Sequence, residues 1–240
     1  METIQFIYRF SWPGARQDNF ELALDAEDLS IVDDTPPSVP TWARLSFHQC
    51  GHCSLKAEES PNCPLAVQLV KLNNLFANVD SHEEVHVEVE TKERTVTFDT
   101  TAQRAIGSLM GLIIPASGCP HTRYLRPMAR FHLPFATEEE TIYRVSSMYF
   151  LAQYFLHQHG HEPDFELSGL RCIYDKLHEI NKCCAQRLRD ASSNDSTVNA
   201  VVILDMFSKA MPYAIEDSLV ELEDLFKPYI ESPPNCPASE

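Results

Sequence analysis

Four cysteines constrain the fold of this chain more than any other feature, because together they could hold one metal ion. Cys50 and Cys53 form a Cys-x2-Cys pair, Cys63 follows after a short loop, and Cys119 lies far downstream. A short turn points both thiolates of such a pair at one centre, which suits a tetrahedral site. If Cys119 completes the site, the ion joins two distant parts of the chain.

The chemistry of this expected site remains open between several alternatives. Mixed cysteine and histidine spacing favours Zn²⁺, whereas the Cys-Pro steps at Cys63 and Cys119 are also common in iron–sulfur motifs. An imidazole could replace one thiolate, or the four cysteines could be reduced thiols that bind no metal. The histidines available for such a replacement are His48, His52 and His121.

The other four cysteines are expected to be structural or incidental. Cys172 and Cys184 lie near the apolar stripe of a predicted helix, where small buried thiols are common. Cys183 and Cys184 are adjacent, so on a helix they point in different directions and do not readily share a metal ion. Cys236 belongs to a proline-rich C-terminal stretch.

The charge of the chain limits its partners. It carries 19 lysines and arginines against 35 aspartates and glutamates, a net charge of −16. Such an acidic protein is not expected to bind nucleic acid or an anionic membrane surface nonspecifically. The N-terminal residues do not resemble a signal peptide and no long apolar stretch is present, so we expect a cytoplasmic location with reduced cysteines.

Alternating hydrophobicity predicts a small antiparallel sheet in the first half of the chain. Val85, Val87 and Val89 alternate with polar residues, and residues 95–98 form a partner strand. Residues 3–10 and 19–25 are expected to form a hairpin. Between the two strand pairs, helical spacing of leucines follows Pro64, which suits the first turn of a helix. The expected order is strand, strand, helix, strand, strand.

The second half of the chain is predicted to be helical. Expected helices cover residues 101–114, a segment after Thr137 with a capping box, and residues 167–188, 196–211 and 215–226. Pro115 is expected to end the helix at 101–114, and Pro212 the helix at 196–211. We therefore predict an α+β protein in which a sheet with a packed helix precedes a helical bundle. The expected division is an α+β domain at 1–115, a helical domain at 116–230 and a disordered tail at 231–240.

Three further patterns could carry chemistry. Arg126, Arg130 and His132 lie in a long loop and could hold an anionic ligand, or could pair with carboxylates of the following helix. Residues 82–86 match His-Glu-x-x-His, but that zinc motif needs a helix and His86 opens a predicted strand. Alternating histidines at 157–161 fall at a helix end, where imidazoles commonly interact with exposed carbonyls.

The stretches around the four cysteines, together with Leu125-Arg126-Pro127-Met128 and the residues that follow to Ala136, resemble a family of uncharacterised bacterial proteins, a domain of unknown function. The likeness covers nearly the whole chain. It implies a bacterial cytosolic protein in which the four motif cysteines are a family feature, and it implies no activity.

These observations lead to an expected function. A closed four-thiolate zinc site supplies folding energy rather than catalysis, so we expect a metal-stabilised binding or regulatory protein. Its partner would be another protein or a small anion near Arg126 and Arg130. The alternatives are an iron–sulfur redox protein or a zinc enzyme with an open site, both using the same cysteines.

Overall fold

The computed structural model of the protein describes residues 2–32, 36, 38–191 and 195–232. At 207, 210–218 and 221 it describes the backbone only. Its sheet has four antiparallel strands in the order β2-β1-β3-β4. The strands are β1 (Thr3–Ser11), β2 (Gln17–Asp25), β3 (Glu84–Glu90) and β4 (Thr95–Thr101). The predicted hairpin and the predicted pair of later strands are therefore confirmed, and β1 joins them by pairing with β3.

One face of the sheet is buried because apolar side chains alternate along three strands. Tyr8 of β1 lies opposite Phe20 of β2 and Val89 of β3, and all three are buried. On the edge strand β4, in contrast, Phe98 is exposed. The sheet therefore offers one apolar face to the helices.

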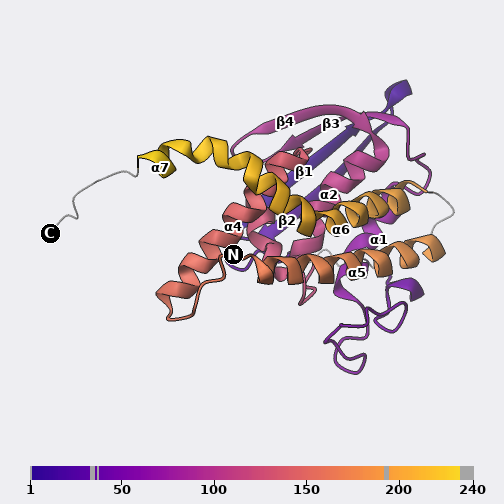
Figure 1. The fold of residues 1–240 in the computed structure, drawn as a ribbon. Coiled ribbons are helices and arrows are strands. Elements are labelled where there is room, and N and C mark those ends of the chain that lie inside the picture. Colours follow the sequence, from indigo (N-terminus) through magenta and orange to yellow (C-terminus); the bar gives the residue numbers. More distant parts are fainter. Residues whose placement is uncertain (1, 33–35, 37, 192–194, 233–240) are drawn as a thin grey trace.

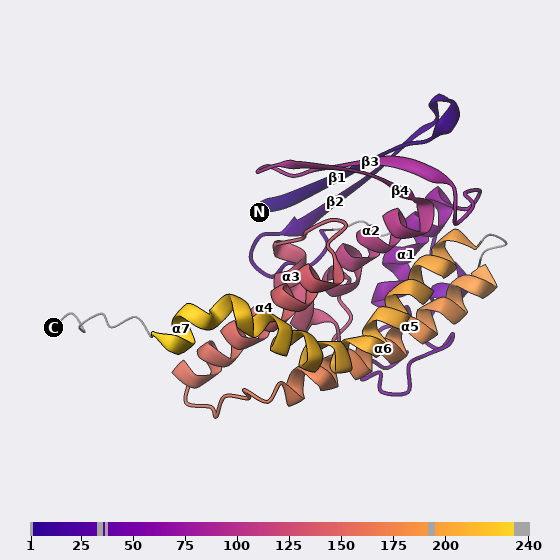
Figure 2. The same ribbon diagram turned by 45° about the horizontal axis from the view of Figure 1, so that its top comes forward.

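Helix α2 (Ala102–Ala116) is the centre of the molecule. It lies with α1 (Pro64–Leu75) against one face of the sheet. On the side of α2 that faces away from the sheet lie α5 (Ser168–Ala191) and α6 (Ser196–Leu222) (Figure 2). Ten of its fifteen residues are buried, as expected for a helix covered on two sides. Its core cluster extends from the sheet to Leu188 of α5 and Val201 of α6, so the two expected domains share one hydrophobic core.

The remaining helices form a smaller group at one end. They are α3 (Arg126–Arg130), α4 (Glu138–Gln158) and α7 (Lys227–Glu231), with a 3₁₀ turn at Arg123–Leu125. The predicted capping box starts α4: Thr137 Oγ1 accepts from the Glu140 amide, and Glu140 accepts from the Thr137 amide. A second core, including Val145 and Leu170, joins α4 to α5.

The predicted breaks at two prolines are wrong. α2 continues through Pro115 to Ala116, and its end is secured by Ser117 and Thr122, whose hydroxyls both donate to the Ile114 carbonyl. α6 is one helix through Pro212 rather than two helices. Its ends are packed in different cores, Val201 in the first and Leu222 in the second, and this burial outweighs one lost backbone hydrogen bond.

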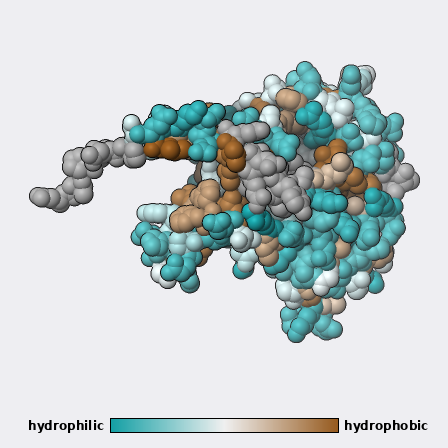
Figure 3. Space-filling view, viewed as in Figure 1, coloured by the Kyte–Doolittle hydropathy of each residue, from teal (hydrophilic) through white to brown (hydrophobic). Residues whose placement is uncertain are grey.

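The outer surface is mostly hydrophilic on the face that Figure 3 shows, with hydrophobic side chains gathered near the C-terminal end of the helical region. Leu225 in the 3₁₀ turn Glu223–Phe226 and Ile230 in α7 are exposed. No helix in the described part of the chain has the length and apolarity that crossing a bilayer requires. Cys236 and most of the expected tail, residues 233–240, lie outside the described residues.

Candidate metal centre

The loop that carries Cys50 and Cys53 is fastened to helix α5 by a buried arginine. Arg187 is 2% exposed and donates hydrogen bonds to the carbonyls of Trp42, Arg44 and Leu45, at 2.7, 2.8 and 3.2 Å. The loop also pairs with itself, since Leu45 donates to the Pro61 carbonyl and Cys63 to that of Ala43. Residues 44–63, which we call the cysteine loop, thus lie beside α5 (Figure 1).

Two carboxylates on α5 hold the tip of the cysteine loop. Glu179 accepts a hydrogen bond from the Gly51 amide at 2.5 Å, and its other oxygen lies 2.8 Å from His52 Nδ1. A Cβ at position 51 would lie only 3.0 Å from the same carboxylate, so glycine permits this approach. Asp190 pairs with His48 Nε2 at 2.8 Å.

These contacts bring six of the seven cysteines in the described part of the chain to one small cavity. The cavity measures about 20 Å³, which is space for about one water molecule. We call it the cysteine cavity. Its cysteines are Cys50, Cys53, Cys63, Cys119, Cys183 and Cys184.

The thiols of the cysteine cavity act on one another electrostatically. Burial, and then the neighbouring thiols Cys183, Cys184 and Cys63, raise the pKa of Cys50, which is hydrogen-bonded to Cys183. Burial also raises the pKa of Cys184 and of Cys119, and Cys63 adds to both shifts. Without a cation, Cys50, Cys119 and Cys184 are therefore neutral thiols at pH 7.

Two histidines of the cavity each keep one buried ring nitrogen without a partner. Nε2 of His52 and Nε2 of His121 are buried and make no hydrogen bond within the described residues. The two rings lie edge to face, with centroids 4.6 Å apart. Glu179 binds Nδ1 of His52, so the lone pair of that imidazole is left on Nε2, inside the cavity. Carboxylate–histidine pairs of this kind orient metal-ligating imidazoles in many proteins.

The cysteine cavity contains the thiol and imidazole donors of a zinc site, but these side chains are not yet placed around one centre. In the parts of the chain that are described, no three His, Cys, Asp or Glu side chains are already placed as ligands of a single ion. Binding an ion here requires the thiols to lose their protons and some side chains to turn towards a common centre. The unpartnered imidazole nitrogens and the soft thiol donors fit Zn²⁺.

Two residues of this cavity were missed by sequence reasoning. Cys183 and Cys184, expected to be structural or incidental, both line the cavity. A signal existed in the spacing: Glu179, Cys183 and Arg187 follow one another at intervals of four, which places them on one face of a helix. Cys172, in contrast, is exposed and outside the cavity.

The three residues predicted to hold an anion do not lie together. Arg126 donates to the carbonyl of Asp28 at 2.6 Å and has the carboxylate of Asp28 at 3.6 Å, so it pairs within the protein, but with the turn after β2 and not with the following helix. Arg130 lies over the ring of Phe131. His132 lines a different, larger pocket and contacts the Tyr8 hydroxyl at 2.6 Å.

The two other histidine patterns lie where the sequence places them. His86 is on strand β3, as expected, and its Nδ1 lies 2.6 Å from Asp99 of the neighbouring strand β4. Residues 82–86 therefore do not form the helical turn that the His-Glu-x-x-His motif needs. The histidines at 157–161 span the C-terminal end of α4 and the turn after it.

Comparison with known proteins identifies a family but no activity. The sequence matches the model of the domain of unknown function DUF6901 over residues 6–227, so the chain belongs to this family. Searches among curated proteins and among solved structures gave no match.

Proposed function

We propose that this DUF6901 protein is stabilised by one Zn²⁺ ion, which binds in the cysteine cavity and fastens the cysteine loop to the helical core. The observation that carries the proposal is the gathering of six cysteines and two unpartnered imidazole nitrogens at one cavity. Chance placement of scattered thiols does not account for their convergence from three separate segments: the cysteine loop, the loop at Cys119, and α5.

The role proposed for the ion is structural. Cys50, Cys53, Cys63 and Cys119 would supply four thiolates, with His52 or His121 as the replacement for one of them, and a site with four protein ligands has no open position for a substrate. Metal binding would then contribute directly to folding, because the unfolded chain holds no such site. Thiolate ligation also requires reduced cysteines, which supports a cytoplasmic location.

Zinc is preferred over an iron–sulfur cluster for two reasons. The cavity has room for about one small atom or ion, whereas a cluster brings several iron and sulfide atoms. The buried imidazole nitrogens also suit zinc, which binds cysteine and histidine together in many structural sites. The colour of the protein distinguishes the two possibilities, because an iron–sulfur cluster makes anaerobically purified protein brown, whereas a zinc protein is colourless.

The experiment is a metal analysis of protein purified without a histidine tag. We expect about one zinc per chain and no visible absorption. Cys119→Ser should lose most of the metal and melt at a lower temperature, because it removes a ligand and the closure of a long loop. Cys172→Ser is the matched control, because Cys172 is exposed and outside the cavity. Equal metal content in wild type, Cys119→Ser and Cys172→Ser would refute the proposal.

A further inference from the structure

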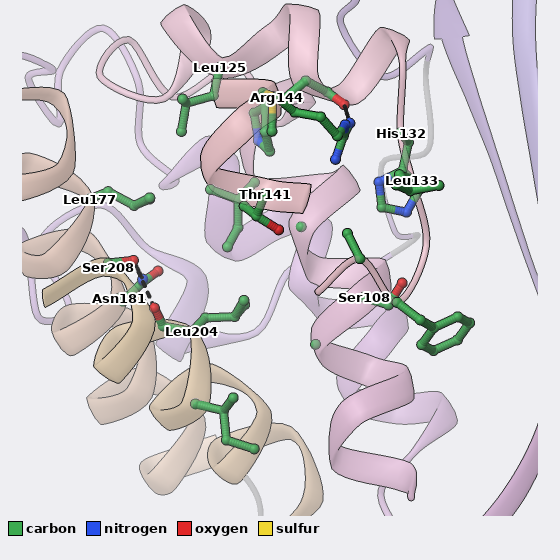
Figure 4. Close-up of a pocket in the computed structure, with 18 of the residues that line it drawn as sticks. Ser108, Leu125, His132, Leu133, Thr141, Arg144, Leu177, Asn181, Leu204 and Ser208 are labelled. Atoms are coloured by element: carbon green, nitrogen blue, oxygen red, sulfur yellow. Dashed lines mark hydrogen bonds between the residues drawn. The ribbon is translucent and has the colours of Figure 1, made fainter. Parts of the chain in front are cut away.

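A second cavity, unconnected with the cysteines, lies among helices α2, α4, α5 and α6 (Figure 4). It measures about 300 Å³, at the lower end of the range typical of small-molecule sites. Most of its wall is apolar, with leucines from four different segments. These are Leu125, Leu133, Leu177 and Leu204.

Helix α2 keeps this cavity open with two glycines. Gly107 and Gly111 are one turn apart, so both lie on the side of α2 that faces the cavity. Glycine is the poorest helix former apart from proline, and close packing commonly explains it inside a helix. That explanation fails here, because a Cβ built on either glycine would have no atom of the described residues within 4 Å. The two glycines instead leave space.

A buried asparagine side chain in the cavity wall has an amide oxygen that accepts no hydrogen bond from the described residues. Asn181 is 1% exposed, and its Nδ2 donates to Ser208 Oγ at 3.0 Å. Ser208 Oγ in turn donates to the Leu204 carbonyl at 2.7 Å, so the amide must face Ser208 with its nitrogen. Its Oδ1 is consequently left buried and without a partner within the described residues, which a ligand with a hydroxyl or N–H group could satisfy.

The charge of the cavity is opposite to that of the protein. Its described lining includes Arg104 and Arg144 but no aspartate or glutamate, although the chain carries a net charge of −16. Arg144 is half-buried and donates to the carbonyls of Met128 and Phe131, and no carboxylate lies within salt-bridge distance of it among the described residues. Glu140, the carboxylate that acts on it through space, is engaged in the capping box of α4.

We propose that this cavity binds an apolar carboxylate of the size of a medium-chain fatty acid, with the carboxylate near Arg144 and the apolar body over Gly107 and Gly111. Arg144 and Asn181 lie on different sides of the pocket (Figure 4). A hydroxyl on the apolar end would therefore meet Asn181 Oδ1 while the carboxylate remains at the arginine. In this proposal the anion would lie near His132, one of the three residues that the sequence suggested for an anion, with Arg144 in place of Arg126 and Arg130.

The test is calorimetric titration of the full-length protein with decanoate, 10-hydroxydecanoate and 1-decanol below their micelle concentrations. Decanoate should bind about tenfold or more tightly than decanol, the factor that a charge-assisted hydrogen bond commonly contributes. 10-Hydroxydecanoate should bind more tightly than decanoate, and Asn181→Leu should abolish that difference. Arg144→Gln should abolish the preference for the carboxylate, whereas Arg123→Gln, an exposed arginine outside the cavity, should preserve it.

A cavity-filling variant makes the test independent of charge. Gly111→Leu should eliminate binding of decanoate while the protein melts no lower than wild type, because the new side chain occupies existing space. The proposal is overturned if decanoate shows no saturable binding to wild type, or if Gly111→Leu binds decanoate as wild type does. Equal affinity for decanoate and decanol would likewise overturn the assignment of the carboxylate to Arg144.

Discussion

Replacing Arg187 with methionine should detach the cysteine loop from helix α5. Arg187 is 2% exposed, and its guanidinium donates to the carbonyls of Trp42, Arg44 and Leu45, at the beginning of the loop and just before it. Methionine keeps much of the apolar stem but removes the guanidinium donor from all three carbonyls, of which that of Arg44 keeps one other donor, the Phe47 amide at 3.2 Å. A lost hydrogen bond to a charged group typically costs about 1.5–3 kcal/mol.

The three losses are not fully additive, because the carbonyls of Trp42 and Arg44 are only partly buried and water can reach them once the loop loosens. We therefore expect a loss of about 3–5 kcal/mol in the free energy of unfolding, less than the full sum for three acceptors at about 1–3 kcal/mol each. Urea denaturation followed by circular dichroism measures this loss.

Arg189→Met is the matched control, two residues along the same helix. Arg189 is exposed, so its replacement should change the free energy of unfolding by no more than about 0.5 kcal/mol. If Arg187→Met is as stable as Arg189→Met, the loop is not held by Arg187 and the geometry of the cysteine cavity loses its support.

Three further predictions concern other parts of the molecule. Burial, and then the charge of Arg144, lowers the pKa of His132 to about 3, below the value of about 6.5 in an unfolded chain. The folded protein therefore keeps His132 neutral at a pH where the unfolded chain protonates it. The stability that depends on neutral His132 is complete above pH ~6.5 and is lost as the pH falls towards 3. Between pH 7 and pH 5, wild type should therefore lose up to about 2 kcal/mol more than His132→Asn in urea denaturation, and equal losses would show that His132 titrates normally. Gly107→Ala should raise the free energy of unfolding by about 0.5–1 kcal/mol, because alanine favours the helix and its methyl group meets no atom of the described part of the chain. A loss of stability would mean that the space beside α2 is closed. Thr137→Ala should cost about 1 kcal/mol through the capping box of α4, and an unchanged urea midpoint would contradict the cap.

The sheet and the order of its elements could be predicted from the sequence because their signals are local. The alternation at Val85, Val87 and Val89 places these side chains on the buried face of β3, and Pro64 begins α1 as expected. The class, an antiparallel sheet followed by helices, is confirmed. The predicted ends at Pro115 and Pro212 were wrong because a local rule about proline cannot weigh the burial on both sides of it.

The candidate sites were less predictable because they depend on which helix faces meet. The Cys-x2-Cys turn is local, and Cys53 indeed donates to the Cys50 carbonyl at 3.0 Å. The spacing of Glu179, Cys183 and Arg187 places these residues on one face of α5, but it does not indicate that this face meets the cysteine loop, since that depends on how α5 packs. In the same way, the pocket beside Gly111 combines side chains such as Arg144 and Asn181 from helices far apart in the sequence. That Cys50, Cys53, Cys63 and Cys119 share one ion stays a prediction.

X-ray absorption at the zinc edge of untagged protein tests the central proposal most directly, because it measures the atoms bound to the metal. The account predicts a shell of sulfur neighbours at about 2.3 Å, with any histidine nitrogen at about 2.0–2.1 Å. Protein that contains no zinc, or zinc surrounded by nitrogen and oxygen alone, would contradict it.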